Sequence, residues 1–140
     1  MTVHWKTTGW QSEYRIFREK TIVGILKKSF WDKTAYGEYN GHLLRFQTQG
    51  LWKPSTRILD IEGTRELGRI EYDSWKTSAR ITYEDQHFDW KRASWRSSSW
   101  SVSNEEEQVD YQQQGFWEKQ GVIEYEWASP AIVLCGLFIS

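Results

Sequence analysis

The segment WDKTAYGEY (31–39) decides how this chain is organised, because it occurs twice more in altered form. WKTSARITY (75–83) and WEKQGVIEY (117–125) keep a tryptophan, a small residue four positions later and a tyrosine four positions after that. Spacing that is preserved in three places indicates an internal repeat, which is typical of architectures built from one duplicated supersecondary unit.

The similarity extends upstream of these segments. Gly24 and Gly68 stand seven residues before the first and second tryptophan, and an aromatic–polar–Trp motif comes earlier still, as WKTTGW (5–10), FQTQGLW (46–52) and WKRASW (90–95). We therefore predict one domain, residues 1–140, with quasi-repeats at about 1–41, 42–85 and 86–128 and an apolar core segment at 129–140.

Each unit contains four short segments of strand character. Ala79, Ile81 and Tyr83 alternate with polar residues, and Asn40-Gly41 is a strong signal for a tight hairpin turn. Three units then give about twelve antiparallel strands, and an open sheet of that width would leave exposed edges. Closure is expected, into a barrel about 24 Å across with a bore of about 14 Å.

The run AIVLCGLFI (131–139) is a candidate to fill that bore. Ser129 is a good N-cap, Pro130 suits the first helical position, and a helix that is apolar all round belongs in a core. The alternative is one more buried strand, since the run contains good strand formers. The predicted fold is all-β with one C-terminal helix, a closed antiparallel barrel around a central apolar helix. Small inward residues would let the wall approach this helix: Ala35, Gly37, Ala79 and Gly121.

Composition limits the class of protein. Aromatic residues make up 16% of the 140 residues, ten of them Trp, which favours a β protein. A formal net charge of −1 argues against a dedicated nucleic-acid binder, and one cysteine excludes an internal disulfide. The N-terminus has no signal-peptide pattern, and 131–139 is too short to cross a bilayer. The expectation is therefore a cytoplasmic protein without a transmembrane segment.

Three quasi-repeats of four strands followed by an apolar segment resemble the tubby C-terminal domain superfamily, which includes the phospholipid scramblases and the LURP-one-related proteins. TIVGILKKSFW (21–31) and ELGRIEYDSW (66–75) are similar to their strands with a glycine after an apolar pair. The resemblance implies a twelve-stranded barrel around a hydrophobic helix. The basic phosphoinositide motif of tubby proteins and the acidic Ca²⁺-binding segment of scramblases have no match here, so the resemblance implies fold more than function.

Catalytic chemistry has little support in the sequence. The three histidines are isolated, and His42 and His87 are expected at a barrel rim beside turns, so no metal site is predicted. Cys135 lies in the most apolar segment, where its thiol would have a raised pKa and stay inert. The run Glu105-Glu106-Glu107 is expected to be solvated. We predict no enzymatic activity and no cofactor.

A basic and aromatic cluster is the best binding candidate. Lys91, Arg92 and Arg96 alternate with Trp90 and Trp95, and Lys27 and Lys28 are expected to add to the cluster. Cations beside exposed rings hold anionic headgroups. The hypothesis is a small binding module that associates with anionic lipid or a protein partner, peripheral to a membrane. The structural alternative is that the tryptophans are packing elements and the basic residues ordinary outward positions.

Two other functions remain open. In a lipocalin-like carrier of a small hydrophobic ligand, the bore would be open and 131–139 would lie outside it or along the wall. In the binding module the same segment fills the middle. Carbohydrate recognition by exposed tryptophans is a third possibility.

Overall fold

The computed structural model describes residues 1–8, 12–29, 33–115 and 119–140. Trp10, Trp31 and Trp117, which belong to the repeat motifs, therefore lie outside the described residues. The described chain forms twelve strands and one helix. Their bounds are β1 (Thr2–Thr8), β2 (Glu13–Arg18), β3 (Thr21–Lys28), β4 (Thr34–Tyr39), β5 (His42–Gln49), β6 (Ser55–Leu59), β7 (Glu66–Ser74), β8 (Ser78–Tyr83), β9 (Gln86–Arg92), β10 (Ser99–Ser103), β11 (Gln108–Gln114), β12 (Gln120–Glu124) and α1 (Pro130–Ile139).

The strands form a closed antiparallel barrel in which each strand pairs with the next along the chain. β1 completes the ring by pairing with β12, with Val3 opposite Ile123 and Trp5 opposite Gly121. Closure gives every strand two partners, so no edge is left to pair with another chain. The predicted twelve-stranded barrel with one C-terminal helix is confirmed, and the alternative of a strand at 131–139 is wrong.

Tight turns connect consecutive strands, and one of them lies at Asn40-Gly41, where the sequence predicts it. Asn40 and Gly41 between β4 and β5 have φ of 48° and 82°, and Glu84 and Asp85 between β8 and β9 have φ of 46° and 66°. Two successive residues with positive φ form the type of turn whose twist matches that of the flanking strands. These local conformations set the register of the hairpins.

Two bulges occur at corresponding places in the barrel wall. The register shifts between Ile16 and Phe17 in β2, where Ile16 faces Gly24, and again between Ile58 and Leu59 in β6. Gly24 lies opposite Tyr39 in the next strand, and a Cβ on Gly24 would approach the Glu38 carbonyl oxygen at 2.9 Å. The glycine is required at this position because the neighbouring strand is so close.

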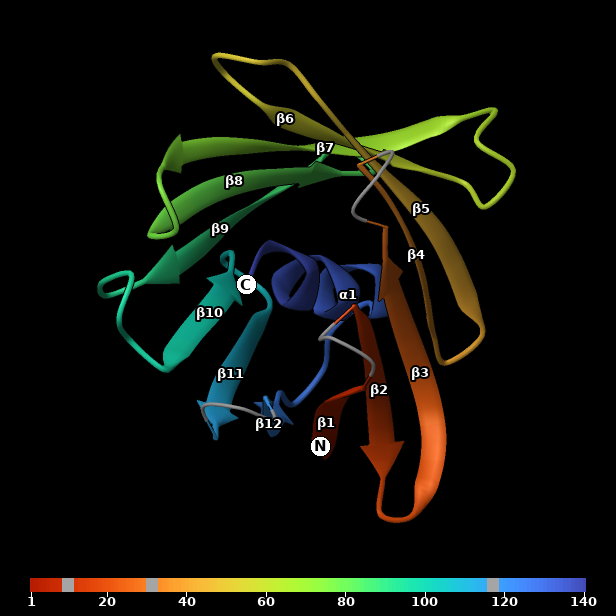
Figure 1. Cartoon of the computed structure of the whole chain (residues 1–140), viewed down its shortest axis with the longest axis vertical. Helices are drawn as coiled ribbons and strands as arrows, with labels where there is room; N and C mark the ends of the chain where they lie inside the picture. Colours follow the sequence, from red (N-terminus) through yellow and green to blue (C-terminus); the bar gives the residue numbers. More distant parts are fainter. Residues whose placement is uncertain (9–11, 30–32, 116–118) are drawn as a thin grey trace.

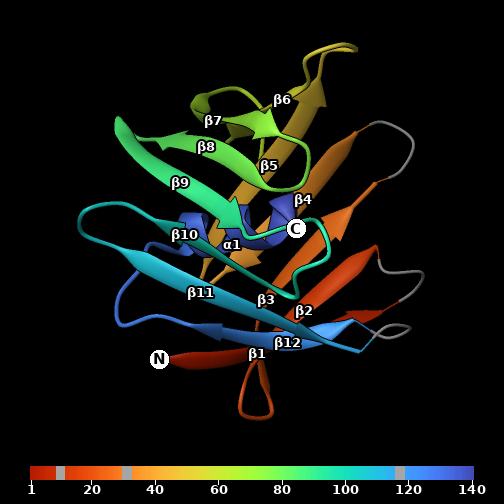
Figure 2. The ribbon, with the colours of Figure 1, turned by 90° about the vertical axis from the view of Figure 1, so that its left-hand side faces the viewer.

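The helix α1 has its side chains buried from Ala131 to Leu137. Figure 1 shows the strands arranged around α1, and in the side view of Figure 2 the helix lies behind β9 and β10. A Cβ on Gly37 would contact Leu134 at 3.3 Å, so this glycine does let β4 approach the helix. Gly121 has a different neighbour, because a Cβ there would meet the Gln112 backbone of β11 and the Trp5 ring.

The start of α1 differs in one respect from the prediction. Ser129 is the N-cap residue, but its side chain makes no capping hydrogen bond. Its carbonyl oxygen instead accepts from the Ile132 and Val133 backbone nitrogens at 3.1 and 3.2 Å, and its own N–H donates to the Glu107 carboxylate at 3.3 Å. Glu107 is buried, and this burial raises the pKa of its carboxyl group. The carboxylate of the β10–β11 connection thus holds the backbone that leads into the helix.

Candidate functional site

The connections between strands alternate between the two ends of the barrel, since every strand pair is antiparallel. Connections β1–β2, β3–β4, β5–β6, β7–β8, β9–β10 and β11–β12 share one end, which we call the tryptophan end. The remaining connections and Met1 share the opposite end, which we call the acidic end. The C-terminus of α1 lies at the tryptophan end, because Lys28, the last residue of β3, donates from Nζ to the Phe138 carbonyl oxygen at 2.9 Å.

The charged residues are sorted between these two ends. In the described connections of the tryptophan end every charged residue is a cation, namely Lys33, Lys53, Lys76, Arg96 and Lys119. Two acids, Asp32 and Glu118, also belong to connections of this end but lie outside the described residues. The connections of the acidic end carry Lys20 and Arg65 against a larger set of acids, which are Glu19, Asp60, Glu62, Glu84, Asp85, Glu105, Glu106, Glu107 and Glu126.

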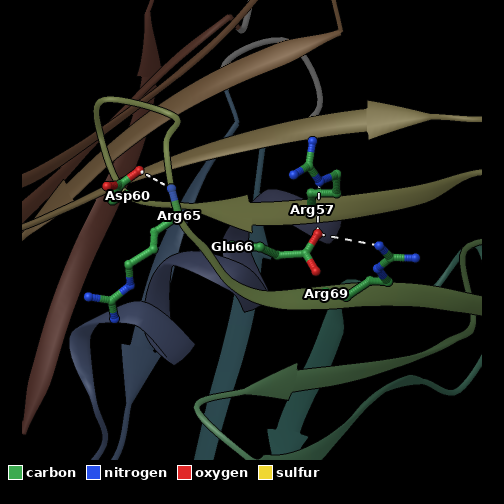
Figure 3. A network of polar contacts seen from close by, with 5 residues as sticks. All are labelled: Arg57, Asp60, Arg65, Glu66 and Arg69. Carbon is green, nitrogen blue, oxygen red and sulfur yellow. Dashed lines mark hydrogen bonds and ion pairs between the residues drawn. The ribbon is translucent and has the colours of Figure 1, made fainter.

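Ion pairs among the described residues involve cations of the strands and not cations of the connections. Within the described part of the chain, none of the five cations in the tryptophan-end connections has an acidic partner. The same holds for Lys20 and Arg65 in the connections of the acidic end. Strand residues form ion pairs near both ends: Glu13 contacts Arg15 and Lys27 near the tryptophan end. Near the acidic end, Glu66 accepts from Arg57 at 2.8 Å and from Arg69 at 3.3 Å (Figure 3). The Arg57 contact contributes most to lowering the pKa of Glu66. The described connections of the tryptophan end thus carry five cations without an ion-pair partner among the described residues.

Large apolar side chains stand exposed at the tryptophan end. Trp52 is 98% exposed and its neighbour Leu51 is 89% exposed, both in the β5–β6 connection. Trp75 and Trp95, in the next two connections of this end, are 72% and 53% exposed. Their ring centroids are 6.3 Å apart. Folding leaves these rings exposed to water, and exposed apolar side chains that gather on one surface are typical of interaction sites.

A cation accompanies each of the two paired rings. The Lys76 Nζ lies 5.1 Å from the centroid of the Trp75 ring, and the Arg96 guanidinium carbon lies 4.7 Å from that of Trp95. A cation over an indole face is attracted by the electron density of the ring. Positive charge and apolar surface are thus presented together at this end.

Lys28 is one of the predicted binding residues, and its side chain points inward. Besides the bond to Phe138, its Nζ lies 4.9 Å from the Tyr14 ring centroid and 5.4 Å from that of Phe138. Burial lowers the pKa of Lys28 to about 8, and repulsion from Lys119 and Lys76 adds to the shift. The ammonium group also complements the negative C-terminal end of the helix dipole.

Arg92, a second predicted residue, occupies the equivalent inward position at the end of β9. Its guanidinium carbon lies 4.7 Å from the Trp100 ring centroid and 5.3 Å from that of Trp90. Both indole nitrogens donate to the Gly136 carbonyl oxygen of α1, at 3.2 Å from Trp90 and 3.0 Å from Trp100. Burial lowers the pKa of Arg92. Arg92 therefore covers buried rings rather than projecting into solvent.

The other predicted residues, Lys27, Lys91 and Arg96, face outward. Lys27 is 3.6 Å from the Glu13 carboxylate, and Lys91 lines an open surface hollow of about 810 Å³ over β9–β11. The structure does not unite the five residues, because β3 and β9 lie on opposite sides of the twelve-strand ring. The expectation that Lys27 and Lys28 extend the Lys91–Arg96 cluster is wrong, since sequence proximity to an aromatic residue says nothing about position around the barrel.

The alternative that the tryptophans are packing elements is correct for some of them and wrong for others. Trp90 and Trp100 are buried and contact α1, as packing elements should be. Trp75 and Trp95 are exposed, although they stand in the same repeat motifs. Sequence reasoning missed Trp52 as a candidate for binding. Trp52 could have been found, because successive connections of an antiparallel barrel alternate between its two ends. This alternation places the β5–β6 connection at the same end as the β9–β10 connection.

Nucleophilic and metal-binding groups are sparse in the described residues. Cys135 is fully buried, and burial raises the pKa of its thiol well above the ordinary value, as predicted. His42 and His87 both lie near the acidic end, where His87 Nδ1 is 3.1 Å from the Thr82 hydroxyl. Among the residues that the structure describes, no three His, Cys, Asp or Glu side chains come together as metal ligands.

No protein-family model, no curated protein and no solved structure matches this chain. Over the described ranges, no helix combines the length and the apolar character that spanning a membrane requires. The inference about function therefore depends on the chemistry of the two ends.

Proposed function

We propose that the protein is a non-enzymatic binding module that docks with its tryptophan end on an anionic membrane surface. The observation that carries this proposal is the separation of charge between the ends: the described connections of one end carry five cations and no acid, and the other end carries most of the loop carboxylates. A basic residue close to an anionic bilayer contributes about 1 kcal/mol to binding. The attraction acts over a Debye length of about 8 Å at physiological salt, so the near end of the molecule dominates.

The net charge of −1 is compatible with this proposal. Acidic residues at the far end are separated from the membrane by the length of the barrel, and screening over that distance removes most of their repulsion. The uneven charge also orients the molecule before contact. Anionic lipids give the cytoplasmic leaflet its negative potential, which fits the cytoplasmic location expected from the sequence.

The finer architecture is part of the same proposal. At the two register shifts the extra residue is Val23 of β3 and Leu67 of β7, directly before Gly24 and Gly68. This correspondence between the first two units supports a wall made of four-strand quasi-repeats. The burial of α1 from Ala131 to Leu137 supports its role as the central apolar helix of a tubby-like barrel. A bore occupied in this way favours the binding module over the lipocalin-like carrier, which needs open volume for its ligand.

Co-sedimentation with vesicles tests the docking. The protein should pellet with phosphatidylcholine vesicles that contain phosphatidylserine or a phosphoinositide, pellet little with phosphatidylcholine alone, and bind more weakly as salt is raised. The triple variant Lys53→Gln/Lys76→Gln/Arg96→Gln should bind about a hundredfold more weakly, from about 1 kcal/mol per cation.

The matched control removes the same charge elsewhere. Lys20→Gln/Arg65→Gln/Arg80→Gln changes two cations of the acidic end and one on the outer face of β8. This variant should bind as the parent does. Equal pelleting of the parent with neutral and anionic vesicles, or equal losses in the two triple variants, would refute docking through the tryptophan end.

A further inference from the structure

The apolar tips of the tryptophan end form an arc along three consecutive connections of that end. Leu51 and Trp52 stand in β5–β6, Trp75 in β7–β8 and Trp95 in β9–β10. Electrostatic docking alone does not need these side chains. Four large apolar groups in water on one rim therefore call for an explanation beyond the attraction between charges.

The loop that carries the most exposed tryptophan has a constrained backbone. Gly50 has a φ of 93°, and a Cβ there would lie 2.8 Å from the Lys53 carbonyl oxygen. Pro54 follows with its restricted φ and approaches the same Cβ position at 3.4 Å. The loop thus holds Leu51 and Trp52 outward, away from the packed interior. Their exposure is built into the local backbone.

The neighbours of these rings indicate what covers them. Each tryptophan of the arc is followed directly in the sequence by a cation, in the pairs Trp52-Lys53, Trp75-Lys76 and Trp95-Arg96. Indole rings favour the headgroup level of a bilayer, where the ring is desolvated and its N–H stays wet. Lysine and arginine reach from that depth to the phosphates. Ring and cation together match a lipid interface, whereas an apolar protein partner would leave the cations uncompensated.

Trp127 at the acidic end provides a comparison within the molecule. It is 66% exposed, but its surroundings are Glu105, Glu106 and Glu126, with which it lines an open hollow of about 570 Å³. Carboxylates at this density are repelled by an anionic bilayer. An exposed tryptophan alone therefore does not indicate contact with an anionic membrane. The cations beside Trp52, Trp75 and Trp95 distinguish these residues from Trp127.

We propose that Leu51, Trp52, Trp75 and Trp95 insert into the headgroup region of an anionic bilayer, so that the barrel stands on its tryptophan end and turns its acidic end to the solvent. The inference rests on the proposed function, and it adds how deeply the side chains enter the bilayer and how the barrel is oriented on it. Binding then has two parts, an electrostatic part that salt weakens and an apolar part that salt does not remove.

Site-specific labelling tests the insertion directly. Cys135 is the only cysteine and is fully buried, so a new surface cysteine is the only accessible site for an environment-sensitive thiol dye. Trp52→Cys and Trp127→Cys place the dye at opposite ends, and the unmutated chain controls for labelling of Cys135. With phosphatidylserine-containing vesicles, the dye at position 52 should shift to shorter wavelength and be quenched by a lipid-borne quencher. The dye at position 127 should do neither.

A binding measurement separates the two parts. Leu51→Ala/Trp52→Ala should weaken binding to the same vesicles at least about tenfold, because about 200 Å² of apolar surface leaves the interface, and should reduce the binding that persists at high salt. Trp127→Ala is the matched control and should bind as the parent does. Circular dichroism of both variants verifies the fold.

The outcomes distinguish failure of the insertion from failure of the docking. If the parent binds anionic vesicles but the dyes at 52 and 127 respond alike, insertion is refuted and electrostatic docking stands. If the parent binds no vesicles, both proposals fall. Binding of the Leu51→Ala/Trp52→Ala variant at parental strength would also refute insertion.

Discussion

The interior of the barrel and its tryptophan end are both rich in aromatic side chains, but they use them in opposite ways. In the interior, Trp100 stacks on Tyr111 with ring centroids 5.6 Å apart and donates its N–H to the Gly136 carbonyl oxygen. At the tryptophan end, Trp52 has no packing partner and is almost fully exposed. Packed rings contribute to the stability of the fold and exposed rings do not. Mutations in the interior should therefore lower the free energy of unfolding, and mutations of the exposed rings should leave it nearly unchanged.

The interaction of the wall with the end of α1 illustrates the interior role. The last carbonyl groups of a helix have no partner within the helix. Here the Phe138 carbonyl oxygen accepts from Lys28, that of Leu137 accepts from the Ser140 hydroxyl, and that of Gly136 accepts from two tryptophans. Tyr111 further donates to the Val133 carbonyl oxygen at 2.8 Å. The helix is thus held by polar contacts as well as by apolar packing.

The largest effect is expected from a charge in the interior. Leu134→Asp should destabilise the fold by about 4 kcal/mol or more, because an unpaired carboxylate would replace a fully buried side chain that lies against β4. Chemical denaturation followed by circular dichroism measures this change. Leu134→Met conserves volume and should cost less than about 1.5 kcal/mol. An Asp variant as stable as the parent would mean that α1 does not need an apolar environment.

A smaller effect is expected when an indole donor is removed. Trp100→Phe should cost about 1 to 3 kcal/mol, since the smaller ring leaves a void and the Gly136 carbonyl loses one donor. Trp5→Phe is the control, because Trp5 is equally buried but its Nε1 has no hydrogen-bond partner among the described residues. Chemical denaturation should give the Trp5 variant a free energy of unfolding about 1 kcal/mol higher than that of the Trp100 variant. The reverse order would show that this hydrogen bond does not hold the helix.

Lys28 links the two regions and makes the stability depend on pH. Its pKa is about 8 in the fold against 10.5 for an unperturbed lysine, so the unfolded chain binds more protons between these values. Stability should therefore rise with pH across this window by about 1 to 3 kcal/mol relative to Lys28→Met, in which the lysine contribution is absent.

The pH profile of the parent must be compared with that of Lys28→Met, because buried tyrosines change the pH dependence of stability in the opposite direction. Burial raises the pKa of Tyr83 to about 12, so the fold keeps a proton that the unfolded chain loses above pH 10, and stability falls there. Lys27→Met on the outer face of β3 is the matched control and should keep the slope of the parent. Identical pH profiles for the parent and Lys28→Met would contradict the burial of this ammonium group.

The smallest effect on stability is expected at the tryptophan end. Trp52→Ala should change the free energy of unfolding by no more than about 0.5 kcal/mol, because the ring makes no packing contact that folding would lose. Thermal denaturation measures this, with Trp127→Ala as a control at a second exposed tryptophan. A loss of more than about 1 kcal/mol in the Trp52 variant would show that the ring packs, and the comparison of the two regions would then fail.

The sequence alone predicted the features that depend on local chemistry. Alternation at Ala79 and Ile81, the turn at Asn40-Gly41 and the apolar run after Pro130 indicated strands, hairpins and a helix, and all are present. These patterns are readable because side-chain direction and turn conformation depend on neighbouring residues only. The tubby-like family and the triplication remain predictions.

The candidate site was predicted only in part. Arg96 and the neighbouring Trp95 do lie at an exposed, cationic surface, as the basic and aromatic pattern suggested. Lys28 and Arg92 do not extend it, because both point inward against aromatic rings. In a strand, a shift of one residue exchanges the inner and outer faces, and a cluster in the sequence mixes both.

What the sequence determined by itself is the repertoire of elements: which segments become strands, where the chain turns, and that residues 131–139 form an apolar run. What only the tertiary structure decided is which residues meet. Closure of the ring put β3 opposite β9, and the antiparallel order gathered distant connections at shared ends. The physical reason is that strand pairing acts between neighbours, whereas the position of a residue around a closed barrel depends on the number and order of all the strands.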